Sequence, residues 1–201
     1  MKHIILASNS PRRRKLLAGL GLDFEIRVLP DIPEEYPQEL PAKEVAGFIA
    51  REKADAYRGT IGQNDLVITA DTVVVVGNEI LGKPKDAEDA RRMLRLISGR
   101  THQVVTGVCL LTEEKERNFS VTTDVSFRQL SEKEINYYIE RYKPFDKAGA
   151  YGIQEWIGYV GVTSISGSYF NVMGLPVQRV WEEIKKLGYE DGPSSCRKDA
   201  E

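Results

Sequence analysis

Short apolar runs separated by polar residues or glycine predict the strands of this chain. The three shortest strands are predicted at 3–7, 66–70 and 73–76. Two longer strands are predicted at 101–112 and 119–130, joined by a polar turn at 113–117. Asp71 and Thr72 separate the second apolar run from the third.

Apolar residues spaced three and four apart predict helices between these strands. Ser10 is a good N-cap and Pro11 suits the first helical position, so the first helix begins there and ends at the glycines that follow Leu17. A second helix is predicted at about 42–57. Three further helices are predicted to begin at Asp86, Ser131 and Pro176.

The remaining segments are predicted to be irregular. Residues 29–41 are rich in proline and acid and indicate an extended loop, whereas 146–168 are rich in glycine with short β-like pieces. The mixture of helices, single strands and long hairpins predicts an α/β fold with a mixed sheet. We expect residues 1–188 to form one domain that divides into two lobes, and the polar residues 189–201 to be a disordered tail.

Composition narrows the class of protein. A net charge of −2 does not favour nucleic acid or an anionic membrane as a partner. The sequence contains neither an apolar run long enough to cross a bilayer nor the order of residues that marks a signal peptide. Cys109 is in a β-like stretch and Cys196 in the polar tail, so we expect no structural disulfide and a cytoplasmic location. The two histidines form no zinc signature.

Three arginines follow the first strand and form the first candidate site. Helix N-termini attract anions and guanidinium groups match phosphate oxygens, which predicts a phosphate site. Arg12 and Arg13 lie in the first helical turn, whereas Arg14 is predicted to face solvent. The alternative is an ordinary solvated helix start.

Asp71 is the most distinctive single residue, because it interrupts a run that otherwise indicates buried strand. A carboxylate there must be paired, bound to metal or required for function. The competing interpretation is a turn aspartate at a strand end.

Two lysines could reach the same region. Lys53 falls on the apolar face of the second helix, three residues after Ala50, and could point into a cleft or extend to water. Lys83, between Gly82 and Pro84, follows the hairpin that carries Asp71, although a surface position is the commoner outcome.

Loop acids and one amide complete the candidates. Glu34 or Glu35 would suit a divalent cation, because magnesium is held by one or two carboxylates together with substrate phosphates. Gln154 could read a base edge through its amide or bond to backbone. The sequence has no Walker loop, Rossmann fingerprint or nucleophile elbow. Together the candidates fit magnesium-assisted cleavage of a polyphosphate.

The sequence also resembles the Maf (septum-formation-inhibitor-like) nucleotide pyrophosphatases over nearly its whole length. The matching motifs occur in family order: Leu6–Arg13, Ala50–Ala54, Ala70–Val74, Leu81–Pro84, Ser98–His102, Asp146–Gln154, and Gly167–Tyr169 through Gly174–Pro176. The resemblance implies hydrolysis of a nucleoside triphosphate to the monophosphate and pyrophosphate with a divalent cation, Mg²⁺ or Mn²⁺. It also implies a fold like that of inosine triphosphate pyrophosphatases, with the cleft between two lobes, and often a homodimer.

The family's residue roles can be carried onto this sequence as expectations. Asp71 corresponds to the catalytic acid–base or metal-linked carboxylate, and Glu34 to the loop acid beside it. The phosphate-binding set corresponds to Ser8, Arg12, Arg13, Lys53 and Lys83.

The resemblance also implies a specificity. Arg12, Thr72 and Gln154 match the trio of the branch that acts on dTTP and UTP, and a neutral amide suits a pyrimidine edge. An acid in place of the amide would suit the cationic base of 7-methyl-GTP. Modified pyrimidine nucleotides, 7-methyl-GTP hydrolysis and a nucleotide-binding regulator of cell division without relevant catalysis stay open as alternatives.

Overall fold

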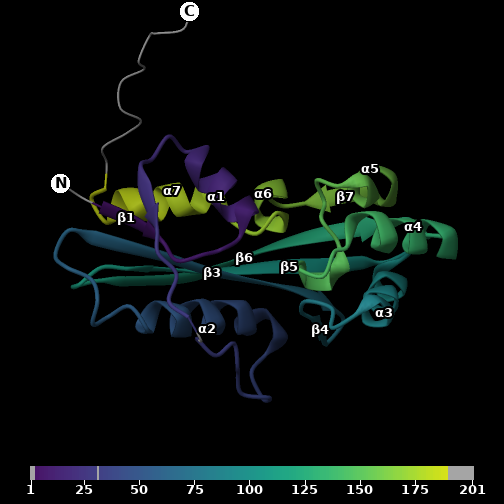
Figure 1. Cartoon of the computed structure of the whole chain (residues 1–201), viewed down its shortest axis with the longest axis horizontal. Helices are drawn as coiled ribbons and strands as arrows, with labels where there is room; N and C mark the ends of the chain where they lie inside the picture. The colour runs from purple at the N-terminus through teal and green to yellow at the C-terminus, as the bar shows by residue number, and fades with distance from the viewer. Residues whose placement is uncertain (1–2, 31, 190–201) are drawn as a thin grey trace, which may run out of the picture.

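The computed structural model describes residues 3–30 and 32–189, and its centre is a seven-stranded mixed sheet (Figure 1). The strands are β1 (His3–Leu6), β2 (Phe24–Ile26), β3 (Asp65–Val76), β4 (Glu79–Leu81), β5 (Thr101–Leu111), β6 (Glu116–Phe127) and β7 (Val162–Ser166). Their order is β2-β1-β3-β5-β6-β7, and β4 also pairs with β3. β1 is parallel to β2 and β3, and the other pairs are antiparallel. The predicted mixed α/β fold is confirmed.

Helices cover both faces of the sheet and one of its ends. They are α1 (Pro11–Ala18), α2 (Ala42–Asp55), α3 (Ala87–Ile97), α4 (Glu132–Tyr142), the short 3₁₀ helix η1 (Ala148–Ala150), α5 (Trp156–Gly161), α6 (Tyr169–Val172) and α7 (Val177–Lys186). In Figure 1, α2 lies below the sheet, α1 and α7 lie above it, and α3 and α4 gather at the right-hand end. No helix in the described part of the chain is long and apolar enough to cross a membrane.

Separate apolar cores form at the two ends of the sheet. One end packs β1, β3 and β5 between α2 on one face and α1 and α7 on the other. The other end packs α3, α4 and α5 against β5 and β6. Tyr189, which sequence patterns place in the tail, is buried in the first core; residues 190–201, including Cys196, lie outside the described residues. The boundary of the domain at 188 stays a prediction.

Two predictions about local structure are wrong. Residues 65–76 form one continuous strand, because Asp71 and Thr72 pair with Gly107 and Thr106 of β5 instead of forming a turn. Residues 146–168 contain helical turns, η1 and α5, as well as the strand β7. The glycines there allow close packing: the backbone of Ile153 lies within 1.8 Å of where a Cβ of Gly158 would stand.

The edge of β3 is open between two of its partners. β1 pairs with β3 only as far as Ile68, and β4 begins to pair at Val74 on the same side. The intervening residues 69–73 are therefore paired to β5 alone. Side chains on both faces of this stretch can reach the space at the open edge.

Candidate active site

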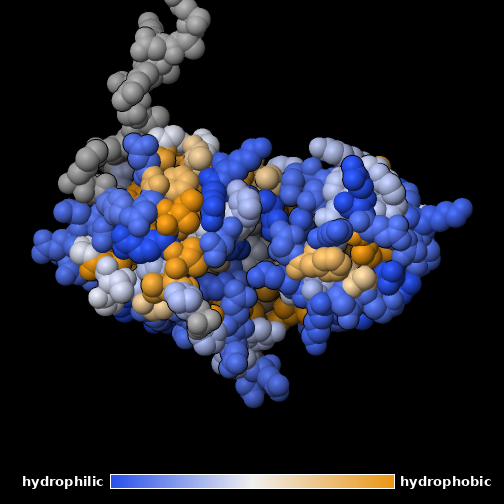
Figure 2. All heavy atoms as spheres, viewed as in Figure 1, coloured by the Kyte–Doolittle hydropathy of each residue, from blue (hydrophilic) through white to orange (hydrophobic). Residues whose placement is uncertain are grey.

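A cleft of about 520 Å³ lies at the open edge of β3, within the range of small-molecule pockets. In Figure 2 the surface is hollowed between the two ends of the molecule, and hydrophilic residues surround the hollow. The cleft is lined by the residues that follow β1, the start of α1, residues 28, 29, 32 and 34, α2, the middle of β3, and residues within 146–154 and 172–174. Every residue that the sequence predicts for the site lines it, apart from Glu35, which lines a separate groove.

Asp71 faces α2 from the interior of β3. Side chains directly opposite each other on paired strands share a face, and Asp71 pairs with Gly107. A Cβ at Gly107 would stand 2.3 Å from the backbone of Ala46, so α2 lies directly against the sheet at this point. This close approach brings Lys53, two turns further along α2, over Asp71.

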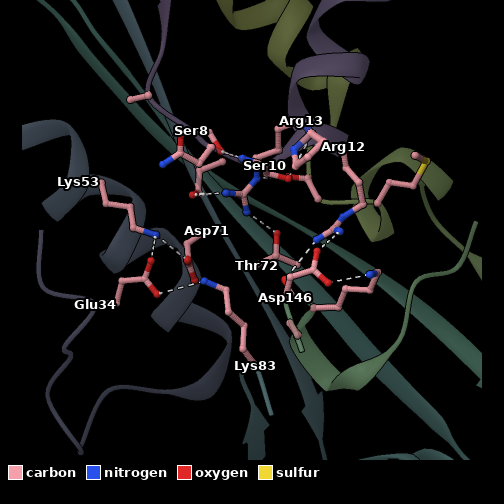
Figure 3. Close-up of a pocket in the computed structure, with 18 of the residues that line it drawn as sticks. Ser8, Ser10, Arg12, Arg13, Glu34, Lys53, Asp71, Thr72, Lys83 and Asp146 are labelled. Carbon is pink, nitrogen blue, oxygen red and sulfur yellow. Dashed lines mark hydrogen bonds and ion pairs between the residues drawn. The ribbon is translucent and has the colours of Figure 1, made fainter. Parts of the chain in front are cut away.

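Lys53 joins two carboxylates into one cluster (Figure 3). Its Nζ lies 2.9 Å from Oδ1 of Asp71 and 2.7 Å from Oε1 of Glu34. The side chains of Lys53 and Asp71 are only 15% and 14% exposed. Of the two outcomes left open for Lys53, the structure has the one in which the side chain points into the cleft and does not extend to water. Lys83 is 61% exposed, and its Nζ lies 3.9 Å from Oε2 of Glu34.

The charges around Glu34 control its protonation. Burial acts to raise the pKa of Glu34, but the hydrogen bond from Lys53 and the positive charges of Lys53, Lys83 and Arg13 outweigh it and lower that pKa overall. Glu34 is therefore a carboxylate at neutral pH.

Thr72 points to the opposite face of the sheet, because successive strand residues alternate. Its Oγ1 accepts a hydrogen bond from Arg13 Nη2 at 3.0 Å and contacts Thr106 Oγ1 at 3.0 Å. Arg13 also donates from Nη1 to the carbonyl of Ala70 and from Nε to the carbonyl of Gly174, both at 2.8 Å. Gly174 has φ +113, which favours glycine.

These contacts give Arg13 a structural task. Three of the five N–H donors of its guanidinium are directed to the protein. Burial lowers the pKa of Arg13, against the attraction of Asp71, but a guanidinium stays charged. Arg13 thus covers the open edge of β3 at Ala70 and holds Thr72, and its phosphate contact stays a prediction.

Arg12 crosses the cleft to the far wall. Its Nη1 donates to Oδ2 of Asp146 at 2.7 Å, and Oδ1 of Asp146 accepts from Lys147 at 2.7 Å (Figure 3). Burial acts to raise the pKa of Asp146, but the hydrogen bonds from Lys147 and Arg12 lower it to about 2.

The start of α1 is built as predicted, with one difference. Ser10 caps the helix by accepting from the N–H of Arg13, and buried Ser8 accepts from the N–H of Ser10 at 3.2 Å. Arg14 does not simply face solvent: it is half-buried, and its Nη2 donates to Asn9 Oδ1 at 3.3 Å.

Gln154 lines the cleft and has one polar atom without a partner among the described residues. Its Oε1 is buried, and in the described part of the chain it has no hydrogen-bond partner. A buried amide oxygen without a partner is costly, and a ligand that donates a hydrogen bond would satisfy it.

The carboxylates fit a magnesium ion that also binds phosphate. In the described residues no group of three or more His, Cys, Asp or Glu could hold a metal. Magnesium commonly takes one or two carboxylates and completes its shell with phosphates and water. Asp71 and Glu34 contact the same ammonium group, that of Lys53, so their carboxylates are close enough to hold one ion if Lys53 moves aside.

Asp146 and Lys147 are the site residues that sequence reasoning missed. Both lie in the motif Asp146–Gln154, from which only Gln154 was assigned a role. The available signal was a charged pair directly before a glycine-rich stretch. The ion-pair partners of Lys147, Asp146 and Glu155, are close to it in sequence. Arg12, which donates a hydrogen bond to Asp146, is 134 positions away from it.

The comparisons with known proteins agree with the motifs. A family model described as "Maf-like protein" matches residues 3–187. A dTTP/UTP pyrophosphatase of Phocaeicola vulgatus is 60% identical over 184 residues, which cover 92% of this chain and 95% of that protein. A dTTP/UTP pyrophosphatase of Bacteroides thetaiotaomicron is 56% identical with the same coverage.

Among solved structures, a HAM1 protein from Coxiella burnetii matches with a TM-score of 0.39 and 16% identity, covering 63% of this chain and 73% of that one. The family model spans almost all of the described residues, and the relatives match across nearly their full length. The chain belongs to the Maf family.

Proposed function

We propose that this chain hydrolyses dTTP and UTP to the nucleoside monophosphate and pyrophosphate. The observation that carries the proposal is the arrangement in one cleft of Arg12, Lys53 and Lys83 with the paired carboxylates Asp71 and Glu34. The name dTTP/UTP pyrophosphatase, given to relatives 60% and 56% identical, supports the choice of substrate.

The cationic side chains bind the triphosphate. Arg12, Lys53 and Lys83 supply positive charge from three different walls of the cleft, together with Ser8 and the first N–H groups of α1. In the free protein Arg12 and Lys53 are paired with carboxylates. An ammonium has three N–H donors and a guanidinium five, so each cation keeps its ion pair and still has a donor for phosphate oxygens.

Asp71 activates the attacking water. Its carboxylate accepts a proton as the water oxygen bonds to the α-phosphorus, and the bond from that phosphorus to the bridging oxygen breaks to release pyrophosphate. Lys53 orients Asp71, and Arg12 and Lys83 stabilise the charge that develops on the leaving group. Glu34 and Asp71 would hold a divalent cation, which neutralises phosphate charge when bound.

Gln154 and Thr72 form the base-reading side. An imide edge offers an N–H donor between two carbonyl acceptors, and the unpartnered Oε1 of Gln154 suits that donor. Modified pyrimidines that keep the imide edge satisfy the same contact, so they are included in the proposed substrate range.

Product identification tests the proposal. The full chain is incubated with Mg²⁺ or Mn²⁺ and a panel of dTTP, UTP, dCTP, GTP and 7-methyl-GTP. Pyrophosphate with dTMP or UMP is the expected result, and chelation of the metal should abolish it. Release of orthophosphate with the nucleoside diphosphate would contradict the proposal, because the bond to the γ-phosphate would then be the one cleaved. Turnover of 7-methyl-GTP alone would contradict the substrate, and tight binding without products would favour a nucleotide-binding regulator.

A further inference from the structure

We propose that Lys147 is a positioning residue that connects the phosphate side of the cleft to its base-reading side, and so determines how sharply the protein distinguishes one base from another. The inference rests on the proposed function and adds to it a residue that does not contact the imide edge itself.

Lys147 is a buried lysine between two carboxylates. The residue is 8% exposed, and its Nζ lies 2.7 Å from Oδ1 of Asp146 and 3.1 Å from Oε1 of Glu155. A buried ammonium is expensive unless it is paired, and breaking such a pair is strongly destabilising because it leaves a charge without compensation. The two carboxylates therefore depend on Lys147 for their positions, and it depends on them.

One carboxylate leads to the phosphate side. Asp146 uses its other oxygen, Oδ2, to accept from Arg12 at 2.7 Å. Asp146 thus holds Lys147 and Arg12 at the same time. The position of Arg12, which we assign to the triphosphate, depends on the ion pair behind it.

The other carboxylate leads to the base-reading side. Glu155 Oε2 accepts a hydrogen bond from the hydroxyl of Tyr138, and that hydroxyl oxygen accepts from the N–H of Gly152 at 2.9 Å. Gly152 precedes Gln154 by two residues, and the N–H of Glu155 closes the turn by donating to the carbonyl of Gly152 at 3.0 Å. The backbone on both sides of Gln154 is therefore held by groups that Lys147 holds.

Lys147 and Gln154 also pack against the same point. A Cβ built on Gly152 would lie 3.0 Å from Cε of Lys147 and 3.0 Å from Nε2 of Gln154. The amide of Gln154 keeps its Oε1 without a partner in the described part of the chain. Its orientation toward a base therefore depends on this packing and on the turn that carries it.

The ratio of kcat/KM for dTTP to that for dCTP measures base discrimination, because dCTP has an amino group and an unprotonated ring nitrogen where dTTP has its imide. Lys147→Met keeps the length of the side chain and removes its charge. We expect this ratio to fall by about tenfold or more, since a displacement of about 1 Å can cost about 10²-fold. Lys147→Arg should recover most of the ratio, and Lys133→Met, an exposed lysine on α4, is the matched control.

A double-mutant cycle shows whether Lys147 acts through Gln154. In a Gln154→Ala background, Lys147→Met should leave the remaining ratio unchanged. The inference would be overturned if Lys147→Met lowered kcat/KM for dTTP and dCTP equally, both with Gln154 present and in the Gln154→Ala background. The ratio would then be unchanged, and the role of Lys147 would be purely structural. If Lys147→Met does not fold, Glu155→Gln interrupts the same network and carries the same expectation.

Binding measurements separate this inference from the proposed function. The ratio of Kd for dCTP to Kd for dTTP is measured by calorimetry in an Asp71→Asn background, where turnover is not needed. Lack of pyrophosphate release by the unsubstituted chain would contradict the proposed function alone. A binding ratio that Lys147→Met leaves unchanged would contradict the role of Lys147 alone.

Discussion

Asp71 is a carboxylate in the interior of a strand, and its surroundings explain how the fold tolerates it. The open edge of β3 admits solvent to the side chain, while Lys53 at 2.9 Å compensates its charge. The sequence identified Asp71 because it interrupts an apolar run, but predicted a break in the strand there. The pairing with β5 that keeps the strand continuous is a tertiary interaction, which local patterns do not report.

Asp71→Asn should retain the fold and nucleotide binding and lose most of the turnover. Loss of a general base commonly reduces the rate by about 10²–10⁴-fold. The measurement is single-turnover release of pyrophosphate from dTTP, with calorimetry as the check on binding. Turnover within a few-fold of the unsubstituted chain would remove Asp71 from the mechanism.

Lys53→Met should change the pH dependence of the reaction as well as its rate. The hydrogen bond and charge of Lys53 lower the pKa of Glu34 against the effect of burial, so their removal raises that pKa. Glu34 then takes up a proton at higher pH than before. We expect the acid limb of kcat/KM against pH to move to higher pH.

The matched control for this shift is Lys43→Met, an exposed lysine in the first turn of α2. An acid limb that stays in place in Lys53→Met, despite a slower reaction, would show that Glu34 is not among the groups whose ionisation controls the rate.

Features of helices that depend only on residues close in sequence could be predicted. The caps at Ser10, Asp86 and Ser131 form as their side chains predict, including the reciprocal bonds between Ser131 and Glu134. The helical phase that places Lys53 inward is likewise local. What the sequence could not supply is contact between distant segments: Arg12 with Asp146, or the seating of α2 on Gly107.

Gly107→Ala tests whether the contact between α2 and the sheet builds the site. A methyl group there would stand 2.3 Å from the backbone of Ala46 and Gly47, which cannot rotate away. Overpacking of this kind costs about 1–3 kcal/mol, so the midpoint of denaturant unfolding should fall. Because Lys53 moves with α2, turnover should fall as well.

Gly59→Ala is the control for this prediction, since nothing lies within 4 Å of the position of its Cβ. A Gly107→Ala protein as stable and as active as the Gly59→Ala protein would show that α2 does not need this contact.

The buried side chain of His102 predicts how the stability of the whole molecule depends on pH. His102 is 1% exposed, its Nε2 lies 2.8 Å from the hydroxyl of Tyr151, and burial lowers its pKa from 6.5 to about 4. The unfolded chain therefore binds a proton at higher pH than the folded one. The contribution of neutral His102 to the free energy of unfolding is complete above pH 6.5 and is lost as the pH falls toward 4.

The loss amounts to about 3 kcal/mol at most. The check is the free energy of unfolding by urea at pH 7 and pH 5, for the unsubstituted chain and for His102→Gln. We expect the unsubstituted chain to lose more stability between these two pH values than the variant does. Equal losses in the two proteins would mean that His102 is protonated in the folded state as readily as in the unfolded one.

The expectation of a homodimer stays a prediction, and light scattering on the full chain would measure it.

The open edge of β3 has a consequence for how this protein could diversify. Asp71 and Thr72 are adjacent, yet one faces α2 and the other faces α1, so the proposed function places hydrolysis and base choice on opposite sides of a single strand. If these roles hold, we expect substitutions around Thr72 to alter which base is accepted and to preserve the contacts around Asp71. We expect insertion of one residue between Ile68 and Asp71 to turn both side chains to the opposite face and abolish both tasks. Substitutions of side chains on β3 are therefore expected to be tolerated more readily than changes in its length.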